Sequence, residues 1–351
     1  MTAYGLLVSP SHNRVYAQSA ADLVKAELAV FGERALGGRV HDIRETEIGG
    51  VPYVTFSGDL ADDDLRLLSN LSSLYALFQI EGELLRPVAL RPLDLFGSDL
   101  LTIQKYSGKT NEYFTKLLLN VTAMATDSPM DLVTGRARVL DPLCGRGTTL
   151  NQAMMYGLDA AGIDIDGKDF DAYAAFVKTW LRNNRVKHQA EITNIRREKA
   201  VLGRRLHVTL GASKERYKSG ETMEIVVVNA DSLDAGKFFR PSSFDLIVTD
   251  APYGVQHGSR PKGERPGQKG GPTLSRSPVE LLTAAVPEWV RLLRPGGAVG
   301  ISWNTYGGRR DELAGILASN GLDVQDSDAY RGFRHRVDQA ITRDLITARK
   351  R

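Results

Sequence analysis

The chain has almost no cysteine, and its apolar residues never form a long run. Cys144 is the single cysteine among 351 residues, which excludes an internal disulfide and a zinc site built on cysteines. No apolar stretch approaches the roughly 18 residues of a membrane span. The first residues show no basic segment leading into an apolar one, as a secretory signal would. We therefore expect a cytoplasmic protein that contacts no membrane, and we predict no metal site.

The first hundred residues show the pattern of a small α+β domain. Apolar spacing predicts the order strand, helix, hairpin, helix, strand, with the second helix over Asp62 to Phe78. A strand over Leu84 to Leu90 contains Pro87, which confines it to a sheet edge. We therefore predict an N-terminal α+β domain over residues 1–100, separate from residues 101–351.

Residues 101–351 alternate between strand and helix patterns. Strands are predicted at 138–140, 160–165, 224–228, 244–249 and 298–303, and the tail from 327 to 349 offers a final antiparallel pair. Alternation of this kind implies a parallel sheet covered by helices on both faces. The predicted fold class is therefore α/β, a Rossmann-like domain with a mostly parallel, seven-stranded sheet.

A glycine turn follows the first of these strands. Gly145 and Gly147 allow a ligand to approach the backbone closely, and the next helix offers free N–H groups at its start. A dinucleotide turn would carry a third glycine, but Leu150 stands there. An acid at the strand end, Asp141, opposes phosphates and suits a cofactor that carries an ammonium and a sulfonium. The segment therefore favours S-adenosylmethionine over a dinucleotide.

Three more acids follow strand ends. Asp164 lies about 20 residues past the glycines, where a carboxylate accepts both ribose hydroxyls. Asp166 competes for that role and also suits the cap of the following helix. Asp231 is placed either to accept from the adenine amino group or to cap a helix. We favour Asp164 for the ribose.

The strand at 244–249 ends in the sequence Asp250-Ala251-Pro252-Tyr253. An exocyclic amine on a nucleobase is a poor nucleophile, because its lone pair is delocalised into the ring. The Asp250 carboxylate and the Ala251 carbonyl are both able to accept its hydrogens, while Tyr253 stacks on the flat base. Positioning then supplies much of the acceleration of a direct methyl displacement. The base must be unpaired or leave its stack.

These segments resemble the amino-methyltransferases whose signature is Asp/Asn-Pro-Pro-Tyr. Within that group, residues 104–348 are most similar to the tRNA guanine-N2-methyltransferases that modify the position-10 guanosine. Matching segments are 141–148, 162–166, 249–255 and Lys105-Tyr106-Ser107-Gly108-Lys109-Thr110. The resemblance implies that the methionine part of the cofactor binds near Thr110. It also implies that five further matched residues belong to the cofactor site. They are Pro142, Cys144, Thr148, Ile165 and Asp250.

Two departures from this family keep alternatives open. Ala251 stands where the family has its first proline. Residues 1–100 are short for the THUMP-type tRNA-binding module, so a degenerate RNA-binding module is one interpretation of them. The predicted partner is a nucleic acid, with tRNA favoured. A DNA adenine-N6 or cytosine-N4 methyltransferase and a non-catalytic nucleic-acid-binding protein with a decayed site are the alternatives. A small activating partner and the oligomeric state stay open.

Cations cluster in two segments near these motifs. Residues 182–221 hold eleven Lys or Arg against four Glu, and residues 260–276 hold five against one. Such clusters suit a polyanion, although a solvated basic surface explains them as well. The side chains proposed to touch the substrate are Arg204, Arg205, His257, Arg260 and Lys262.

Overall fold

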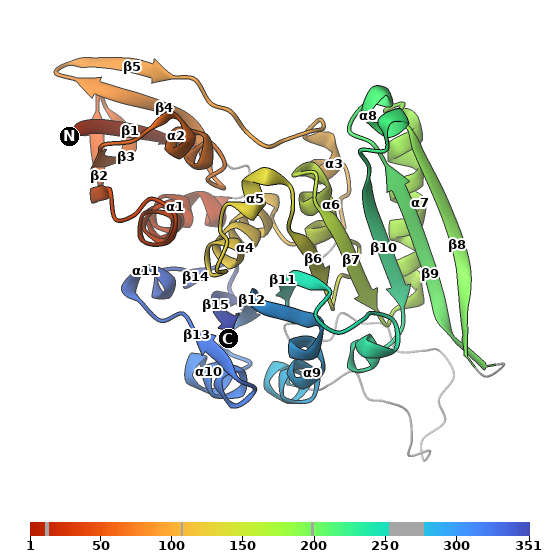
Figure 1. Ribbon diagram of the computed structural model, residues 1–351. Helices are drawn as coiled ribbons and strands as arrows, with labels where there is room; N and C mark the ends of the chain where they lie inside the picture. The colour runs from red at the N-terminus through yellow and green to blue at the C-terminus, as the bar shows by residue number, and fades with distance from the viewer. Residues whose placement is uncertain (11–13, 107, 198–199, 253–276) are drawn as a thin grey trace.

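The computed structural model describes residues 1–10, 14–106, 108–197, 200–252 and 277–351. The described strands form two sheets (Figure 1), a five-stranded sheet at the N-terminus and a ten-stranded sheet in the remainder. Because the site motifs follow strands of the larger sheet, its topology decides which of them meet.

The smaller sheet has the order β2-β3-β1-β4-β5, and its neighbouring strands are antiparallel. Its elements are β1 (Thr2–Val8), α1 (Arg14–Arg34), β2 (Val40–Ile48), β3 (Val51–Gly58), α2 (Asp62–Leu68), β4 (Leu74–Glu81) and β5 (Leu84–Val88). The β2–β3 hairpin agrees with the sequence prediction, and β5 with Pro87 lies at a sheet edge as expected. The helix predicted over Asp62 to Phe78 is wrong, because α2 ends at Leu68 and β4 begins at Leu74. Pairing of β4 with β1, about seventy residues away in sequence, overrides the helical spacing.

Five parallel strands form the centre of the larger sheet, in the order β12-β11-β6-β7-β10. They are β6 (Arg138–Asp141), β7 (Asp159–Asp164), β10 (Met223–Asn229), β11 (Phe244–Asp250) and β12 (Leu293–Asn304). Antiparallel to β12 runs β15 (Thr342–Lys350), and β13 (Leu322–Val324) and β14 (His335–Arg336) pair antiparallel with the far side of β15. The predicted parallel strands and the antiparallel tail are therefore confirmed.

An unpredicted hairpin extends the other edge of this sheet. It consists of β8 (His188–Arg197) and β9 (Ala200–Leu210), and β9 pairs antiparallel with β10. The period-2 pattern is present in β9, where Leu206, Val208 and Leu210 are buried. Its many cations were interpreted from the sequence either as a polyanion-binding cluster or as a solvated basic surface, and no strands were predicted there. With this hairpin and β14, the described sheet has ten strands where seven were predicted.

Helices cover both faces of the larger sheet. The described ones are α3 (Asp99–Thr102), α4 (Glu112–Met124), α5 (Asp131–Thr134), α6 (Thr148–Met155), α7 (Gly167–Asn183), α8 (Lys214–Ser219), α9 (Pro278–Leu292), α10 (Arg310–Ser319), α11 (Asp328–Arg331) and the 3-10 helix η1 (Ser232–Lys237). One core lies under α4, α6 and α7, and a second lies under α9 and α10. No described helix is long and apolar enough to cross a membrane.

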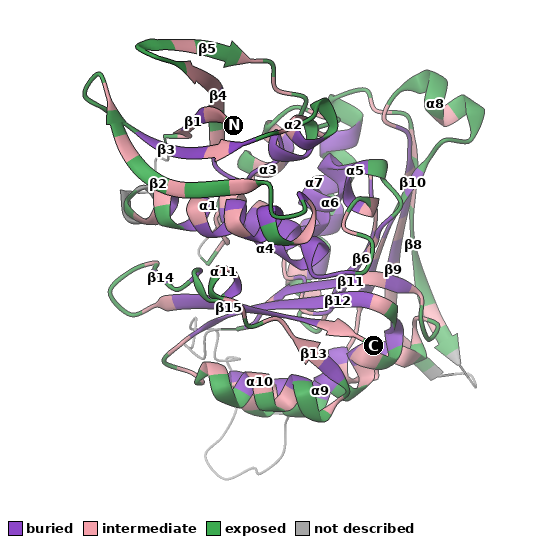
Figure 2. Ribbon diagram, turned by 60° about the vertical axis from the view of Figure 1, so that its left-hand side comes forward, coloured by how far each residue is buried: buried purple, intermediate pink, exposed green. Residues whose placement is uncertain are grey.

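The N-terminal unit packs on this domain through a buried polar network. In Figure 2, α1 runs beside α4. Glu27 of α1 is fully buried and accepts hydrogen bonds from Asn120 Nδ2 of α4 at 2.8 Å and from Ser72 Oγ at 2.6 Å. Arg34 Nε of α1 donates to the Met124 carbonyl at 3.0 Å, at the end of α4. Residues of both units belong to one continuous apolar core.

Candidate active site

The glycine turn joins the carboxyl end of β6 to α6. Gly145 and Gly147 have φ angles of 48° and 77°, in the left-handed region that glycine adopts without strain. A Cβ on Gly147 would lie 2.3 Å from Cε2 of Tyr173, so only glycine fits there. A Cβ on Gly145 would meet no described atom within 4 Å. The turn therefore exposes its backbone on the Gly145 side, as a ligand cradle requires.

Asp141 ends β6 beneath this turn and is 3% exposed. Its Oδ1 accepts from Thr249 Oγ1 at 2.8 Å and from the Leu143 amide at 3.1 Å. Burial is the main cause that raises the pKa of this carboxyl to about 6. Asp141 thus ties β6 to β11 and is an acid whose ionised form would gain from a nearby cation.

Asp164 ends β7 and holds the turn from the other side. Its two oxygens accept from the Gly145 and Asp166 amides, each at 2.7 Å. Burial, ahead of the neighbouring acids, raises the pKa of Asp164 to about 6. Asp166 caps α7 by accepting from the Lys168 amide at 2.7 Å, the alternative role expected for it. This arrangement leaves Asp164 as the acid on the turn.

The remaining cofactor candidates lie around the turn with different environments. Asp231 follows β10 and caps η1, accepting from the Leu233 amide at 2.9 Å. Cys144 is buried within the turn, and burial raises the pKa of its thiol well above the usual value, which suits packing. Pro142 is buried beside it, whereas the side chain of Ile165 is 52% exposed at the same sheet edge.

The segment before α4 lies against the glycine turn. The Tyr106 hydroxyl is 3.1 Å from Thr148 Oγ1, and the Arg146 guanidinium stacks 4.7 Å from the Tyr106 ring centroid. Four residues further on, Thr110 Oγ1 donates to Asp250 Oδ2 at 2.7 Å. The segment therefore links the glycine turn to Asp250, and Tyr106 becomes a candidate site residue through its contacts with Thr148 and Arg146.

Asp250 stands at the carboxyl end of β11 with a network of donors around it. Besides Thr110, Ser302 Oγ of β12 donates to Oδ1, and Arg343 Nη2 of β15 lies 3.3 Å from Oδ2. The Ala251 amide donates to the Ser302 carbonyl at 2.8 Å, and Pro252 is exposed. Ser302 and Arg343 come from distant strands and carry no local motif, which is why the sequence analysis missed them.

Four predicted site residues lie outside the described residues. They are Tyr253, His257, Arg260 and Lys262.

Arg204 and Arg205 lie on opposite faces of β9. Arg204 Nη1 donates to Asp171 Oδ1 at 2.7 Å, and its guanidinium stacks 4.6 Å from the Phe170 ring. Both partners belong to α7, so Arg204 holds the hairpin against that helix. Arg205 is half-buried on the other face and pairs in register with Val228 of β10. Its Nε has no hydrogen-bond partner among the described residues.

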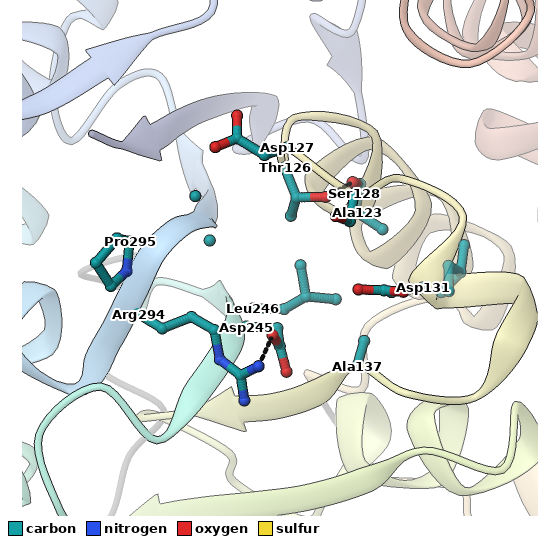
Figure 3. Close-up of a pocket in the computed structure, with 13 residues that line it drawn as sticks. Ala123, Thr126, Asp127, Ser128, Asp131, Ala137, Asp245, Leu246, Arg294 and Pro295 are labelled. Atoms are coloured by element: carbon teal, nitrogen blue, oxygen red, sulfur yellow. Dashed lines mark hydrogen bonds and ion pairs between the residues drawn. The ribbon is translucent and has the colours of Figure 1, made fainter.

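A pocket lies at the amino-terminal ends of β6 and β11, whereas the candidate site lies at the carboxyl ends of these strands (Figure 3). Asp245 is the second residue of β11, while Asp250 is its last. Asp245 Oδ1 forms an ion pair with Arg294 Nη1 at 2.8 Å, and its Oδ2 accepts from the Arg138 amide at 2.7 Å. These contacts fix the amino-terminal ends of β6 and β11. Neither Asp250 nor any of its hydrogen-bond donors named above lines the pocket.

The two buried acids and the open backbone at the glycine turn fit S-adenosylmethionine. Asp141 and Asp164 are buried acids with raised pKa values, so a cation and two hydroxyl donors next to them would favour their ionised forms. The open side of Gly145 provides space for a ligand at the backbone. Among the described residues, no group of three or more His, Cys, Asp and Glu is arranged to hold a metal ion.

Comparison with known proteins agrees with this geometry. Residues 131–277 match the family model UPF0020, described as an RMKL-like methyltransferase domain. No curated protein matches the chain.

Solved structures with similar folds share little sequence with the chain. TrmN from Thermus thermophilus is 16% identical with a TM-score of 0.41, covering 88% of this chain and 59% of TrmN. A TehB-like S-adenosylmethionine-dependent methyltransferase from Corynebacterium glutamicum is 14% identical with a TM-score of 0.32, covering 61% and 80%. Geranyl diphosphate methyltransferase, solved with its substrate and sinefungin, is 13% identical with a TM-score of 0.33, covering 61% and 72%. This chain thus spans less than two thirds of TrmN.

The parallel sheet, the glycine turn and the family model lead to one conclusion. The larger part of the chain has a class I methyltransferase fold, and its cofactor is S-adenosylmethionine. The chain carries an S-adenosylmethionine-dependent methyltransferase domain.

Proposed function

We propose that the domain methylates the exocyclic amino group of a nucleobase, with guanine N2 in tRNA as the favoured acceptor. The observation that carries this proposal is the position of Asp250 at the carboxyl end of β11, joined through Thr110 to the segment that packs on the glycine turn. Carboxyl ends of parallel strands share one sheet edge, so acceptor acid and cofactor turn face the same space.

Ala251 replaces a proline of the related signature, and a backbone hydrogen bond takes over part of the proline's role. The Ala251 amide donates to the Ser302 carbonyl at 2.8 Å, which a proline has no N–H to do. Ala251 is also 1% exposed, so the surrounding core restricts it. The backbone at the Ala251 amide is therefore held by β12, and this order makes a decayed site the weaker alternative.

The chemistry of the proposed step follows from these acceptors. S-adenosylmethionine supplies a methyl group on a sulfonium. The Asp250 carboxylate and the Ala251 carbonyl accept the two amino hydrogens and hold the nitrogen lone pair toward that methyl group. With the cofactor bound, the nitrogen would take the methyl group as the sulfur–methyl bond breaks. S-adenosylhomocysteine would be the leaving group, and the methylated nitrogen would lose a proton to solvent. Alignment of the three atoms supplies much of the acceleration.

The basic hairpin supports a nucleic-acid substrate. Arg204 of β9 pairs with Asn229, the last residue of β10, so β9 residues 200–203 continue past the carboxyl end of β10. At about 3.3 Å per residue, the hairpin projects roughly 13 Å beyond the site edge of the sheet. Arg196 is exposed near its tip. Cations placed beside the site suit contacts to the phosphate backbone.

The net charges of residues 1–100 and 101–351 also favour phosphate contacts at the β8–β9 hairpin. Residues 1–100 contain 8 Lys or Arg and 14 Asp or Glu, a net charge of −6. The remaining residues carry a net charge of +9. Because an acidic unit repels phosphates, we assign backbone contacts to the hairpin edge of the methyltransferase domain and not to the N-terminal unit.

The direct test is methyl transfer from radiolabelled S-adenosylmethionine to unmodified tRNA transcripts, ribosomal RNA and single-stranded DNA, followed by nucleoside mass spectrometry. We expect N2-methylguanosine from tRNA. Asp250→Asn should remove transfer while the affinity for S-adenosylmethionine changes by less than about threefold. Asp245→Asn, at the other end of the same strand, is the matched control and should retain activity. Label in DNA alone, or in none of the three, contradicts the proposal.

A further inference from the structure

Arg343 is a buried cation beside the acceptor acid. It lies on β15 between β12 and β14, where Asn304 and His335 are its partners in register. Its side chain is 4% exposed, and Nη2 lies 3.3 Å from Asp250 Oδ2. The guanidinium also stacks on the ring of Phe114 from α4, with Cζ 4.4 Å from the centroid. Strand pairing and stacking together fix the guanidinium in one place.

We propose that Arg343 is a positioning residue that holds the Asp250 carboxylate in a single orientation, and thereby restricts the acceptor to atoms that carry hydrogens. The proposal rests on the proposed function, because it concerns the acid that receives the target amine.

The donors around Asp250 define that orientation. Thr110 and Arg343 approach Oδ2, and Ser302 donates to Oδ1. These donors come from three separate segments: the loop before α4, β15 and β12. Rotation of the carboxylate would break several of these contacts at once. The remaining lone pairs are therefore directed by the protein and not by the substrate.

The charge of Arg343 needs a countercharge nearby. A buried guanidinium is strongly disfavoured unless an acid pairs with it. The neighbouring His335 provides no countercharge, because an imidazole ring is either neutral or positive; burial, ahead of the repulsion from Arg343, lowers its pKa to about 4. The ion pair with Asp250 meets this need and ties the guanidinium to the carboxylate.

A charged carboxylate selects the acceptor atom. It accepts hydrogen bonds and donates none. An exocyclic amino group presents a hydrogen to it, whereas an unprotonated ring nitrogen or a carbonyl oxygen presents a lone pair and is repelled. Arg343 therefore contributes to specificity for amines without touching the base.

The surroundings of Arg343 also reach the N-terminal unit. The Phe114 ring lies 5.1 Å from the His335 ring, and His335 meets the Tyr16 ring of α1 edge-on at 6.3 Å. Through these rings α1 contacts the support of the acceptor acid. The N-terminal unit thus braces the group that holds Asp250.

The test compares Arg343→Met and Arg343→Lys with Arg349→Met as matched control. Arg349 lies near the other end of β15, where it pairs with Asp127 and Asp323. The measurements are the single-turnover rate of methyl transfer to tRNA, the KM for tRNA, the calorimetric affinity for S-adenosylmethionine and the melting temperature.

We expect Arg343→Met to lower the single-turnover rate by about 100-fold, as a misplaced catalytic group does. Its affinity for S-adenosylmethionine and its KM for tRNA should change less than about threefold. Arg343→Lys keeps the charge without the planar fork and should recover part of the rate. Arg349→Met should resemble wild type.

Equal rates for wild type and Arg343→Met would overturn the proposal, as would a parallel loss of rate and cofactor affinity. If Arg343→Met does not fold, Arg343→Lys is the variant to measure. A wild-type rate in Arg343→Lys would then refute the claim that a planar guanidinium is needed to hold the Asp250 carboxylate. A wild-type enzyme that methylates no nucleic acid instead refutes the proposed function, so the two failures are distinguishable.

Discussion

Substitution of Asp250 should destabilise the protein as well as inactivate it. Asp250→Asn removes the charge that faces the buried guanidinium of Arg343 at 3.3 Å. Coulomb's law gives about 5 kcal/mol for such a pair at an effective dielectric constant near 20. Removing one partner of a buried pair typically costs about 3–5 kcal/mol. Because the Asp250 side chain is 19% exposed, we expect the lower end of that range, about 3 kcal/mol.

Removing the cation instead should cost less. After Arg343→Met, Thr110 and Ser302 still donate to the Asp250 carboxylate, and solvent reaches its exposed part. We expect a loss of about 1–2 kcal/mol in the free energy of unfolding, in the range of common single substitutions. The double variant leaves no unpaired charge and should also lose only about 1–2 kcal/mol, so the coupling energy is about 3 kcal/mol.

Urea unfolding followed by tryptophan fluorescence measures these free energies in the four proteins of the cycle. A coupling energy below about 0.5 kcal/mol, the usual scatter of independent sites, would refute the ion-pair argument. So would an Asp250→Asn variant as stable as wild type. The result also decides how activity data are interpreted, because any loss of turnover in Asp250→Asn must be corrected for the folded fraction.

Three further predictions concern the cofactor and the substrate. Gly147→Ala would place Cβ 2.3 Å from a tyrosine ring of α7, so calorimetry should show at least a tenfold loss of cofactor affinity, roughly the effect of 1.4 kcal/mol of strain. Burial raises the pKa values of Asp141 and Asp164 to about 6, above the usual 3.8. Because the folded protein then holds these protons more tightly than the unfolded chain, the stability of the free protein should fall as pH rises from 4 to 6. Affinity for the cationic cofactor should instead rise between pH 5 and 7, as the two acids ionise. Stability that rises with pH, or cofactor affinity that falls with pH, over these ranges would contradict this assignment. Replacing both Arg196 and Arg205 with Ala should weaken tRNA binding and reduce its logarithmic salt slope by about 1–2; an unchanged slope would make the hairpin an ordinary solvated surface.

Local patterns in the sequence were sufficient to predict the centre of the fold. The turn could be predicted from Gly145 and Gly147, because few other residues adopt their positive φ angles. The position of Asp250 could be predicted because it ends a continuous apolar strand. The capping roles expected for Asp166 and Asp231 could also be inferred, since a cap depends on neighbours two residues away. These features share one property, namely that the contacts that define them are local.

Features that depend on distant pairing were missed or misjudged. The β8–β9 hairpin has alternating apolar residues, but its cations resembled a surface cluster, and only pairing with β10 shows it to be part of the sheet. The helix predicted through residues 69–78 fails because β4 pairs with β1. Arg343 follows Asp250 by 93 residues and belongs to no motif, so its ion pair emerges only from the fold.

The measurement that tests the central claim most directly is nucleoside mass spectrometry of tRNA, ribosomal RNA and DNA from a strain that lacks this gene. The proposed function predicts that N2-methylguanosine disappears from tRNA, that the wild-type gene restores it, and that the Asp250→Asn gene does not. Methylated nucleosides unchanged in all three fractions, or a loss confined to DNA, would contradict the assignment of this site to an RNA amine.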